Sequence, residues 1–183
     1  MRGSPFYMLE GEQKLVERAK EGESSAFGLL YDYYLPKIYR FVLIKVGQRE
    51  EAEDITHLTF LKAWESIDRY SYRGYSFGSW LYRIARNVVV DHYRGAPIQI
   101  SLEDADEPAS DEPRPGHDLD TRAEYDKVMR ALSKLGALEQ DVIIMRFVDD
   151  LPVRDVAEAV GKSEGAVKLV QHRAMKKLKD YLK

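Results

Sequence analysis

The chain has 183 residues, with 28 Lys and Arg against 31 Asp and Glu, which gives a formal net charge of −3. It contains no cysteine, which excludes disulfides, thiol nucleophiles and zinc–thiolate sites and fits a cytoplasmic protein. Its apolar runs are short and interrupted by charges, so we expect no membrane insertion. Apolar residues make up 44% and charged residues 32% of the chain, which is the balance of a foldable helical protein.

Charge is unevenly divided along the chain. Residues 1–94 carry 14 basic and 13 acidic side chains and residues 121–183 carry 13 basic and 10 acidic ones, whereas 95–120 carries one Arg against eight acids. This central segment also holds four of the seven prolines and no Phe, Trp or Tyr. Because it has too little apolar surface to fold, we predict an acidic flexible linker over 95–120 between two domains, 1–94 and 121–183.

Apolar residues recur at helical spacing in the first domain, which predicts an all-α fold. The expected helices cover 9–20, 24–47, 50–67 and 79–93, with a loop over 68–76. Pro36 is expected to kink or restart the second helix and Gly47 to end it. The third helix is expected to bury Ile55, Leu58, Thr59 and Ala63. The fourth is expected to bury Trp80, Ile84 and Val88, with Tyr82.

The second domain is predicted to form four helices, over 122–134, 138–148, 153–160 and 164–181. The last two fit a helix-turn-helix, with small Ala157 at the crossing, Gly161 in the turn and Ser163 as N-cap. The exposed side of the final helix then offers Lys168, Gln171, His172, Arg173, Lys176 and Lys177. Basic groups there suit phosphates and Gln suits a base edge, although an ordinary helical hairpin with a solvated basic face is the alternative.

Aromatic and basic residues alternate in the loop before the fourth helix of the first domain. We expect Tyr70, Tyr72 and Tyr75 to be exposed, where aromatic faces stack on unpaired bases while Arg69 and Arg73 hold the backbone. Phe77 and Trp80 are expected in the core instead. Polar side chains on the following helix extend this surface, namely Arg83, Arg86 and Asn87. The loop indicates single-stranded nucleic acid and the helix-turn-helix indicates duplex, a combination suited to DNA that is being melted.

Catalysis is not expected from this sequence. The four histidines are far apart and have no partner at a recognised metal-ligand spacing. There is no glycine-rich phosphate loop and no nucleophile elbow. We therefore predict no metal, no cofactor and no enzymatic activity.

At these motifs the chain closely resembles an extracytoplasmic-function sigma factor, a two-domain initiation subunit of bacterial RNA polymerase. Residues 53–64 (EDITHLTFLKAW) resemble the polymerase-binding helix of sigma region 2, and 77–87 (FGSWLYRIARN) resemble its helix for promoter melting and −10 reading. Residues 135–147 resemble the start of region 4, and 164–174 its −35-reading helix. The sequence departs from the family at His57, where Gln is usual. It also departs at 169–171, where this chain has Leu-Val-Gln and the family more commonly has a small polar residue followed by Arg and Leu.

The resemblance implies a non-catalytic initiation factor with three sets of binding residues. The polymerase clamp helices would be contacted by Asp54, His57, Leu58 and Lys62. The melted −10 element would be bound by Arg69, Tyr72, Arg73, Tyr75, Arg83, Arg86 and Asn87. The −35 duplex would be read by Ser163, Glu164, Lys168, Gln171, His172, Arg173 and Lys176. The second domain would also touch the polymerase flap, and an anti-sigma factor is expected as a partner.

Two other functions fit parts of the sequence. One is a polymerase-independent helix-turn-helix regulator, which would need no aromatic–arginine loop. The other is an RNA-binding or RNA-processing protein, which that loop would also suit. Promoter-specific transcription with core RNA polymerase would separate all three.

Overall fold

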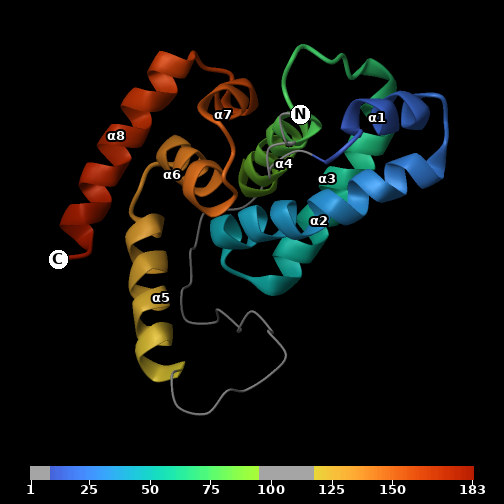
Figure 1. Ribbon diagram of the computed structural model, residues 1–183. Helices are drawn as coiled ribbons and strands as arrows, with labels where there is room; N and C mark the ends of the chain where they lie inside the picture. Colours follow the sequence, from blue (N-terminus) through green and yellow to red (C-terminus); the bar gives the residue numbers. More distant parts are fainter. Residues whose placement is uncertain (1–8, 95–117) are drawn as a thin grey trace.

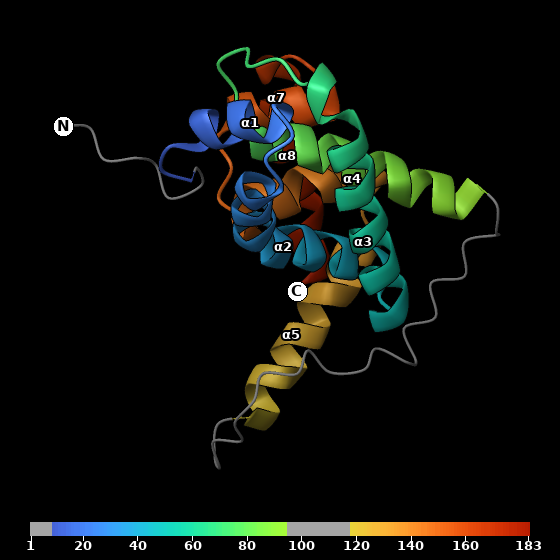
Figure 2. The same ribbon diagram turned by 90° about the vertical axis from the view of Figure 1, so that its right-hand side faces the viewer.

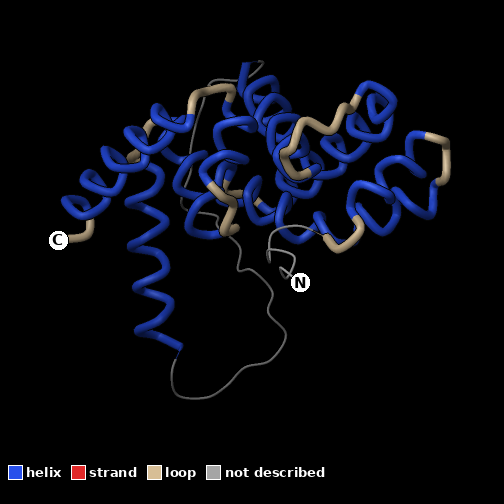
Figure 3. The backbone as a smooth tube through the Cα atoms, turned by 45° about the horizontal axis from the view of Figure 1, so that its top comes forward, coloured by secondary structure: helices blue, strands red, loops and turns tan. Residues whose placement is uncertain are grey.

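The computed structural model describes residues 9–94 and 118–183, which contain helices joined by short loops and no strand (Figure 1, Figure 3). The predicted all-α class is therefore confirmed. The N-terminal unit consists of α1 (Glu12–Lys20), α2 (Ser24–Val46), α3 (Arg49–Ser66), the 3-10 turn η1 (Ile67–Arg69) and α4 (Phe77–Arg94). The C-terminal unit consists of α5 (Asp118–Ser133), α6 (Ala137–Ile143), the π-turn η3 (Ile144–Val148), α7 (Val153–Val160) and α8 (Glu164–Tyr181).

Pro36 does not restart α2, which runs from Ser24 to Val46 as one helix. Proline lacks a backbone N–H and so leaves the carbonyl of Asp32 without its helical donor. Both residues are exposed, which places the lost bond on the side of the helix that faces water. Gly47 ends the helix as predicted, with φ +77° and its N–H donating to the carbonyl of Leu43.

Glu12 joins α1 to the start of α4. It is 4% exposed and accepts hydrogen bonds from the Tyr34 hydroxyl of α2 and, at 2.7 Å, from the backbone N–H of Phe77. A carboxylate at a helix N-terminus offsets unpaired N–H groups and the helix dipole. Gly78 allows the same close packing, because a Cβ there would lie 2.6 Å from Cε1 of Tyr34.

The helix-turn-helix of the C-terminal unit has the predicted local structure. Gly161 adopts φ +65° between α7 and α8, and the Ser163 hydroxyl accepts a hydrogen bond from the N–H of Ala166 at 3.2 Å. The single helix predicted over 138–148 is interrupted, since α6 gives way to the π-turn η3 after Ile143.

The predicted linker lies mostly outside the described residues, which omit 95–117. Helix α5 begins at Asp118, four residues before the helix start predicted at 122.

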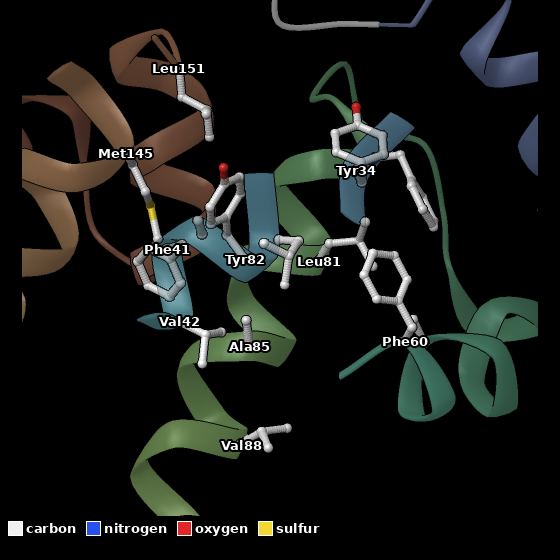
Figure 4. Close-up of a cluster of buried hydrophobic side chains, with 14 of the residues drawn as sticks. Tyr34, Phe41, Val42, Phe60, Leu81, Tyr82, Ala85, Val88, Met145 and Leu151 are labelled. Carbon is white, nitrogen blue, oxygen red and sulfur yellow. The ribbon is translucent and has the colours of Figure 1, made fainter. Parts of the chain in front are cut away.

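One hydrophobic core crosses both units. Figure 4 shows Met145 and Leu151 of the C-terminal unit beside Phe41 of α2 and Tyr82 of α4. Each of these side chains is at most 3% exposed. The charge pattern predicts two domains, and no sequence pattern indicates that they share a core.

Helix α5 lies outside this shared core. It packs on α6 and α8 through a second cluster that includes Leu132, Leu135, Ile143 and Leu178. Figure 2 shows its N-terminal end extending away from the other helices. Within the described ranges, no helix combines the length and apolar character needed to cross a bilayer.

The Glu12 carboxylate should affect how the free energy of unfolding depends on pH. Burial raises its pKa above the usual range, against the opposing effect of its hydrogen bonds, so the folded chain binds a proton more tightly there than the unfolded chain. The contribution of Glu12 to the free energy of unfolding should therefore fall as pH rises from about 4.5 to 7. Glu12→Gln should make that decline shallower, as measured by urea denaturation across this range.

A matched control for this substitution is Glu10→Gln, which removes an exposed carboxylate two residues away. Its pH profile should follow that of the parent chain. A Glu12→Gln profile parallel to the parent's would show that this carboxylate does not set the pH dependence.

Candidate functional site

The outer face of α3 combines charged and apolar side chains. Asp54, His57 and Lys62 are exposed there, together with Leu58 and Leu61, which are 40% and 48% exposed. One turn further, Trp64 is 37% exposed and its ring lies 4.9 Å from that of Phe27 in α2. Clustered exposed apolar side chains with a charged rim are typical of a protein-binding surface.

The buried stripe predicted for α3 was wrong at Leu58. The helix instead buries Ile55, Thr56, Thr59, Phe60 and Ala63. Thr56 and Phe60 shift the centre of the buried face around the helix, which leaves Leu58 on the other side. The four predicted polymerase-binding residues, Asp54, His57, Leu58 and Lys62, therefore all lie on exposed surface of one helix.

The aromatic–arginine loop is only partly exposed. Tyr72 is 48% exposed and Tyr75 is half-buried, whereas Tyr70 is 8% exposed, so the prediction that Tyr70 is exposed was wrong. The Tyr70 ring packs 5.3 Å from Phe77 and 5.2 Å from Trp80, and burial raises its pKa. The hydrophobic contacts of Tyr70 thus anchor the loop on α4.

A pocket of about 200 Å³ lies between this loop and α4. Its lining includes three arginines, Arg69, Arg73 and Arg83, which are all exposed. Aromatic walls come from Tyr70, Tyr75 and Trp80, and Glu158 of α7 completes the rim. Flat aromatic walls and guanidinium groups suit an unpaired base with its phosphate. Asn87 is exposed on α4 about one turn beyond Arg83.

Ion pairs with buried carboxylates join the two units. Asp141 of α6 accepts from Lys45 Nζ at 2.8 Å and from Arg86 Nε at 2.7 Å, and its side chain is 5% exposed. Asp149 accepts from Arg40 Nε at 3.0 Å and from the Tyr82 hydroxyl at 2.8 Å. Burial raises the pKa of Asp149, although both hydrogen bonds oppose that shift. Arg86, a predicted −10 residue, is thus already engaged by the C-terminal unit.

The solvent face of α8 presents most of the predicted −35 residues. Those exposed are Ser163, Glu164, Lys168, His172, Arg173 and Lys176. The helix packs on the core through Val167, Ala174 and Leu178. Lys177, also exposed, pairs with Glu139 of α6 at 2.8 Å.

Gln171 departs from the predicted arrangement. It is half-buried, and its Oε1 accepts a hydrogen bond from Arg146 Nε at 3.3 Å. Gln171 lies closer than Lys168 to the buried face that Val167 and Ala174 define, so these two residues do not share one exposed face. Arg146 also donates to the carbonyl of Leu151, which ties this side of α8 to the turn before α7.

Comparison with known families matches these two units in order. Residues 30–96 match the model of Sigma-70 region 2, and residues 131–180 match that of Sigma-70, region 4. The chain is 39% identical over 174 residues to the ECF RNA polymerase sigma factor BldN of Streptomyces coelicolor. The chain belongs to the ECF sigma factors of the sigma-70 family. That alignment covers 90% of this sigma factor and 63% of BldN, so the chain spans less than two thirds of the relative's length.

Two solved structures share the fold of this sigma factor. CnrH, in complex with the cytosolic domain of CnrY, is 24% identical with a TM-score of 0.72, over 93% of this chain and 96% of that one. The sigma factor RpoE, in complex with the anti-sigma factor NepR from Bartonella quintana, is 24% identical with a TM-score of 0.65. That match covers 85% of this chain and 96% of the RpoE chain. Both likenesses extend over regions 2 and 4.

No pattern in the sequence indicates the residues that join the two regions of the sigma factor. Arg40 and Lys45 lie singly among apolar residues of α2, and Asp141, Asp149 and Asp155 are scattered over the C-terminal unit. Glu12 precedes the matched part of region 2. Among the described side chains, no group of three or more His, Asp or Glu is arranged to hold a metal ion.

The Asp141 carboxylate should stabilise the packing of region 2 against region 4, which we call the closed arrangement. Asp141→Ala leaves Lys45 and Arg86 without their buried counter-charge, and breaking such a pair typically costs about 3–5 kcal/mol. We expect a loss of this size in the free energy of unfolding, measured by urea denaturation at pH 7. Asp126→Ala, which removes an exposed carboxylate from α5, is the matched control and should change it by less than about 0.5 kcal/mol. A similar small change in both variants would contradict this expectation.

Proposed function

We propose that this chain is a sigma factor that directs core RNA polymerase to specific promoters and catalyses nothing itself. Region 2 would bind the clamp helices of the polymerase through α3 and capture the melted −10 element through the loop before α4. Region 4 would read the −35 duplex with α8 and touch the polymerase flap. Its place of action would be the cytoplasm. One observation carries this proposal: the same chain has both the aromatic–arginine pocket of region 2 and the basic exposed face of α8.

The proposed polymerase contact rests on the outer face of α3. Asp54 is exposed in its second turn, and Leu58 and Leu61 lie on the same exposed part of the helix. None of these side chains is needed by the core of region 2, so the fold leaves them available for a partner. Leu58 supplies apolar area and Asp54 a directional hydrogen bond.

The proposed DNA contacts are of two kinds, one to single-stranded DNA and one to duplex DNA. The pocket before α4 offers aromatic faces and arginines, which suit a single strand whose bases are unpaired. Helix α8 offers exposed cations on one side of a helix-turn-helix, which suits a duplex groove. We assign Lys168 to base edges and Arg173 and Lys176 to phosphates, because the first turns of such a helix enter the groove deepest. We assign Gln171 to the hydrogen bond with Arg146.

An anti-sigma factor is proposed as a further partner. The CnrH structure contains the cytosolic domain of CnrY, and the RpoE structure contains the anti-sigma factor NepR. The exposed apolar side chains on α3 of this chain are a surface that such a protein could cover in competition with polymerase.

Transcription with purified components tests the proposed function. The chain is added to core RNA polymerase with genomic DNA, and transcript 5′ ends are sequenced. We expect discrete start sites that core polymerase alone does not give. Binding to promoter duplex without any effect on polymerase would instead favour the polymerase-independent regulator.

Asp54→Ala should weaken polymerase binding without changing the fold. A charged hydrogen bond lost at an interface costs about 1.5–3 kcal/mol, or roughly 10- to 150-fold in affinity. The measurement is titration of core polymerase with a fluorescently labelled chain, with circular dichroism to confirm helicity. Asp32→Ala, an exposed acid of α2, should leave affinity unchanged. An unchanged affinity for Asp54→Ala would make Asp54 only a residue that favours the helix dipole.

Lys168→Ala and Lys176→Ala should have different effects on −35 binding. The first should cost about 1–3 kcal/mol on the best site and flatten the preference at one base pair. The second should weaken all sites alike and lower the salt slope by about one. A set of single-base substitutions in the −35 element, titrated with polymerase holoenzyme at two salt concentrations, measures both. The reverse pattern would mean that α8 docks in another orientation.

A further inference from the structure

The outermost side of α8 carries a leucine near its centre. An α-helix has about 3.6 residues per turn, so residues spaced by four, three and four positions share one side. The exposed residues of α8 with this spacing are Gly165, Leu169, His172 and Lys176. The helix packs on the core through the opposite side, which carries Val167 and Ala174, and Figure 1 shows α6 and α7 on one side of α8 only. Leu169 is 49% exposed and therefore projects into solvent.

The fold of region 4 requires neither Leu169 nor Gly165. Within the described part of the chain, Leu169 belongs to neither hydrophobic cluster. Gly165 lies in the first turn of α8, and a Cβ there would meet no atom within 4 Å. Alanine would favour the helix more than glycine does, whereas glycine is typical of places where a backbone approaches a ligand closely. Both residues therefore suit a contact outside the chain.

The charges around Leu169 indicate what it contacts. Lys168 and Arg173 are exposed on either side of it, and Lys176 is exposed two turns further along the helix. An apolar side chain within a cationic rim fits the major groove of duplex DNA, where phosphates border the base edges. Among those edges only thymine presents a methyl group, at its C5 atom. A leucine offers an apolar surface to that methyl group and no hydrogen bond to any base.

We propose that Leu169 is a specificity-determining residue of the −35 contact, which packs against the C5-methyl group of a thymine in the major groove. Gly165, one turn earlier, leaves the backbone of α8 open to the approach of the base pairs. This inference rests on the proposed function and deepens it, because it names the base that region 4 prefers at one position. Salt weakens the contacts of Lys168 and Arg173 with DNA but does not screen an apolar contact. The preference for the methyl group is therefore independent of salt, although the affinity is not.

The test compares thymidine with deoxyuridine, which lacks only the C5-methyl group. The full chain, alone and bound to core RNA polymerase, first selects a preferred duplex from a library of short randomised duplexes, with core polymerase alone as background. Each thymidine of that duplex is then replaced in turn by deoxyuridine, and binding is measured by fluorescence anisotropy at two salt concentrations. One replacement should weaken binding about fourfold, as expected for the loss of one buried methyl group, and by the same factor at both salt concentrations.

Three variants assign this effect to one side chain. Leu169→Ala should bind the thymidine duplex about fourfold less tightly than the parent chain and should no longer distinguish thymidine from deoxyuridine at that position. Leu169→Met keeps an apolar side chain and should retain the discrimination. The matched control is Met175→Ala, which removes a side chain that is 44% exposed on another side of α8 and should bind like the parent. Alanine and methionine both favour helices, and circular dichroism confirms that the variants fold.

Discrimination that persists in Leu169→Ala would overturn the proposal, because deoxyuridine would then act through another residue or through the shape of the duplex. A library without a preferred duplex, or a preferred duplex that tolerates every replacement, would also overturn it. These failures are separable from a failure of the proposed function. Promoter-specific transcripts without methyl-dependent binding would overturn only the role of Leu169. Methyl-dependent binding without promoter-specific transcripts would overturn the proposed function and support the contact of Leu169 with thymine.

Discussion

Burial of carboxylates between the two regions is the constraint on which the closed structure depends. Asp141, Asp149 and Asp155 are each at most 6% exposed, and each is met by donors from the N-terminal unit. Charges removed from water at such cost require partners with good geometry. Their partners are cations of α2 and α4 and the N–H of Ser76 just before α4, and one of these cations, Arg86, is a predicted −10 residue.

The apolar contacts make this arrangement cooperative. Met145 and Leu151 of region 4 pack in one hydrophobic core with Phe41 and Tyr82 of region 2. The Tyr82 hydroxyl also donates a hydrogen bond to Asp149. Separation of the regions would therefore expose apolar surface and unpair buried charges together. Helix α5 packs through a separate cluster that includes Leu132 and Leu178, and α2 reaches this cluster through Ile44.

Sequence patterns predicted the helices well because local signals set their ends. Gly47, Gly161 and Ser163 are such signals, and each has the expected geometry. Predictions were wrong where a residue's neighbours come from another element. Tyr70 is buried because Phe77 and Trp80 are folded back onto it, and Gln171 is drawn inward by Arg146. The partners of Asp141 are 55 and 96 residues away, and no periodicity within the chain marks such a pairing.

The open position of α8 has a consequence for the free protein in a crowded cell. Its basic face points to solvent, whereas the pocket of region 2 is bordered by α7. A chromosome exposes single strands wherever it is replicated or transcribed, and these could act as decoys for a permanently open pocket. Under the proposed function, a chain that meets DNA first through α8 would sample duplex and pass over those single strands.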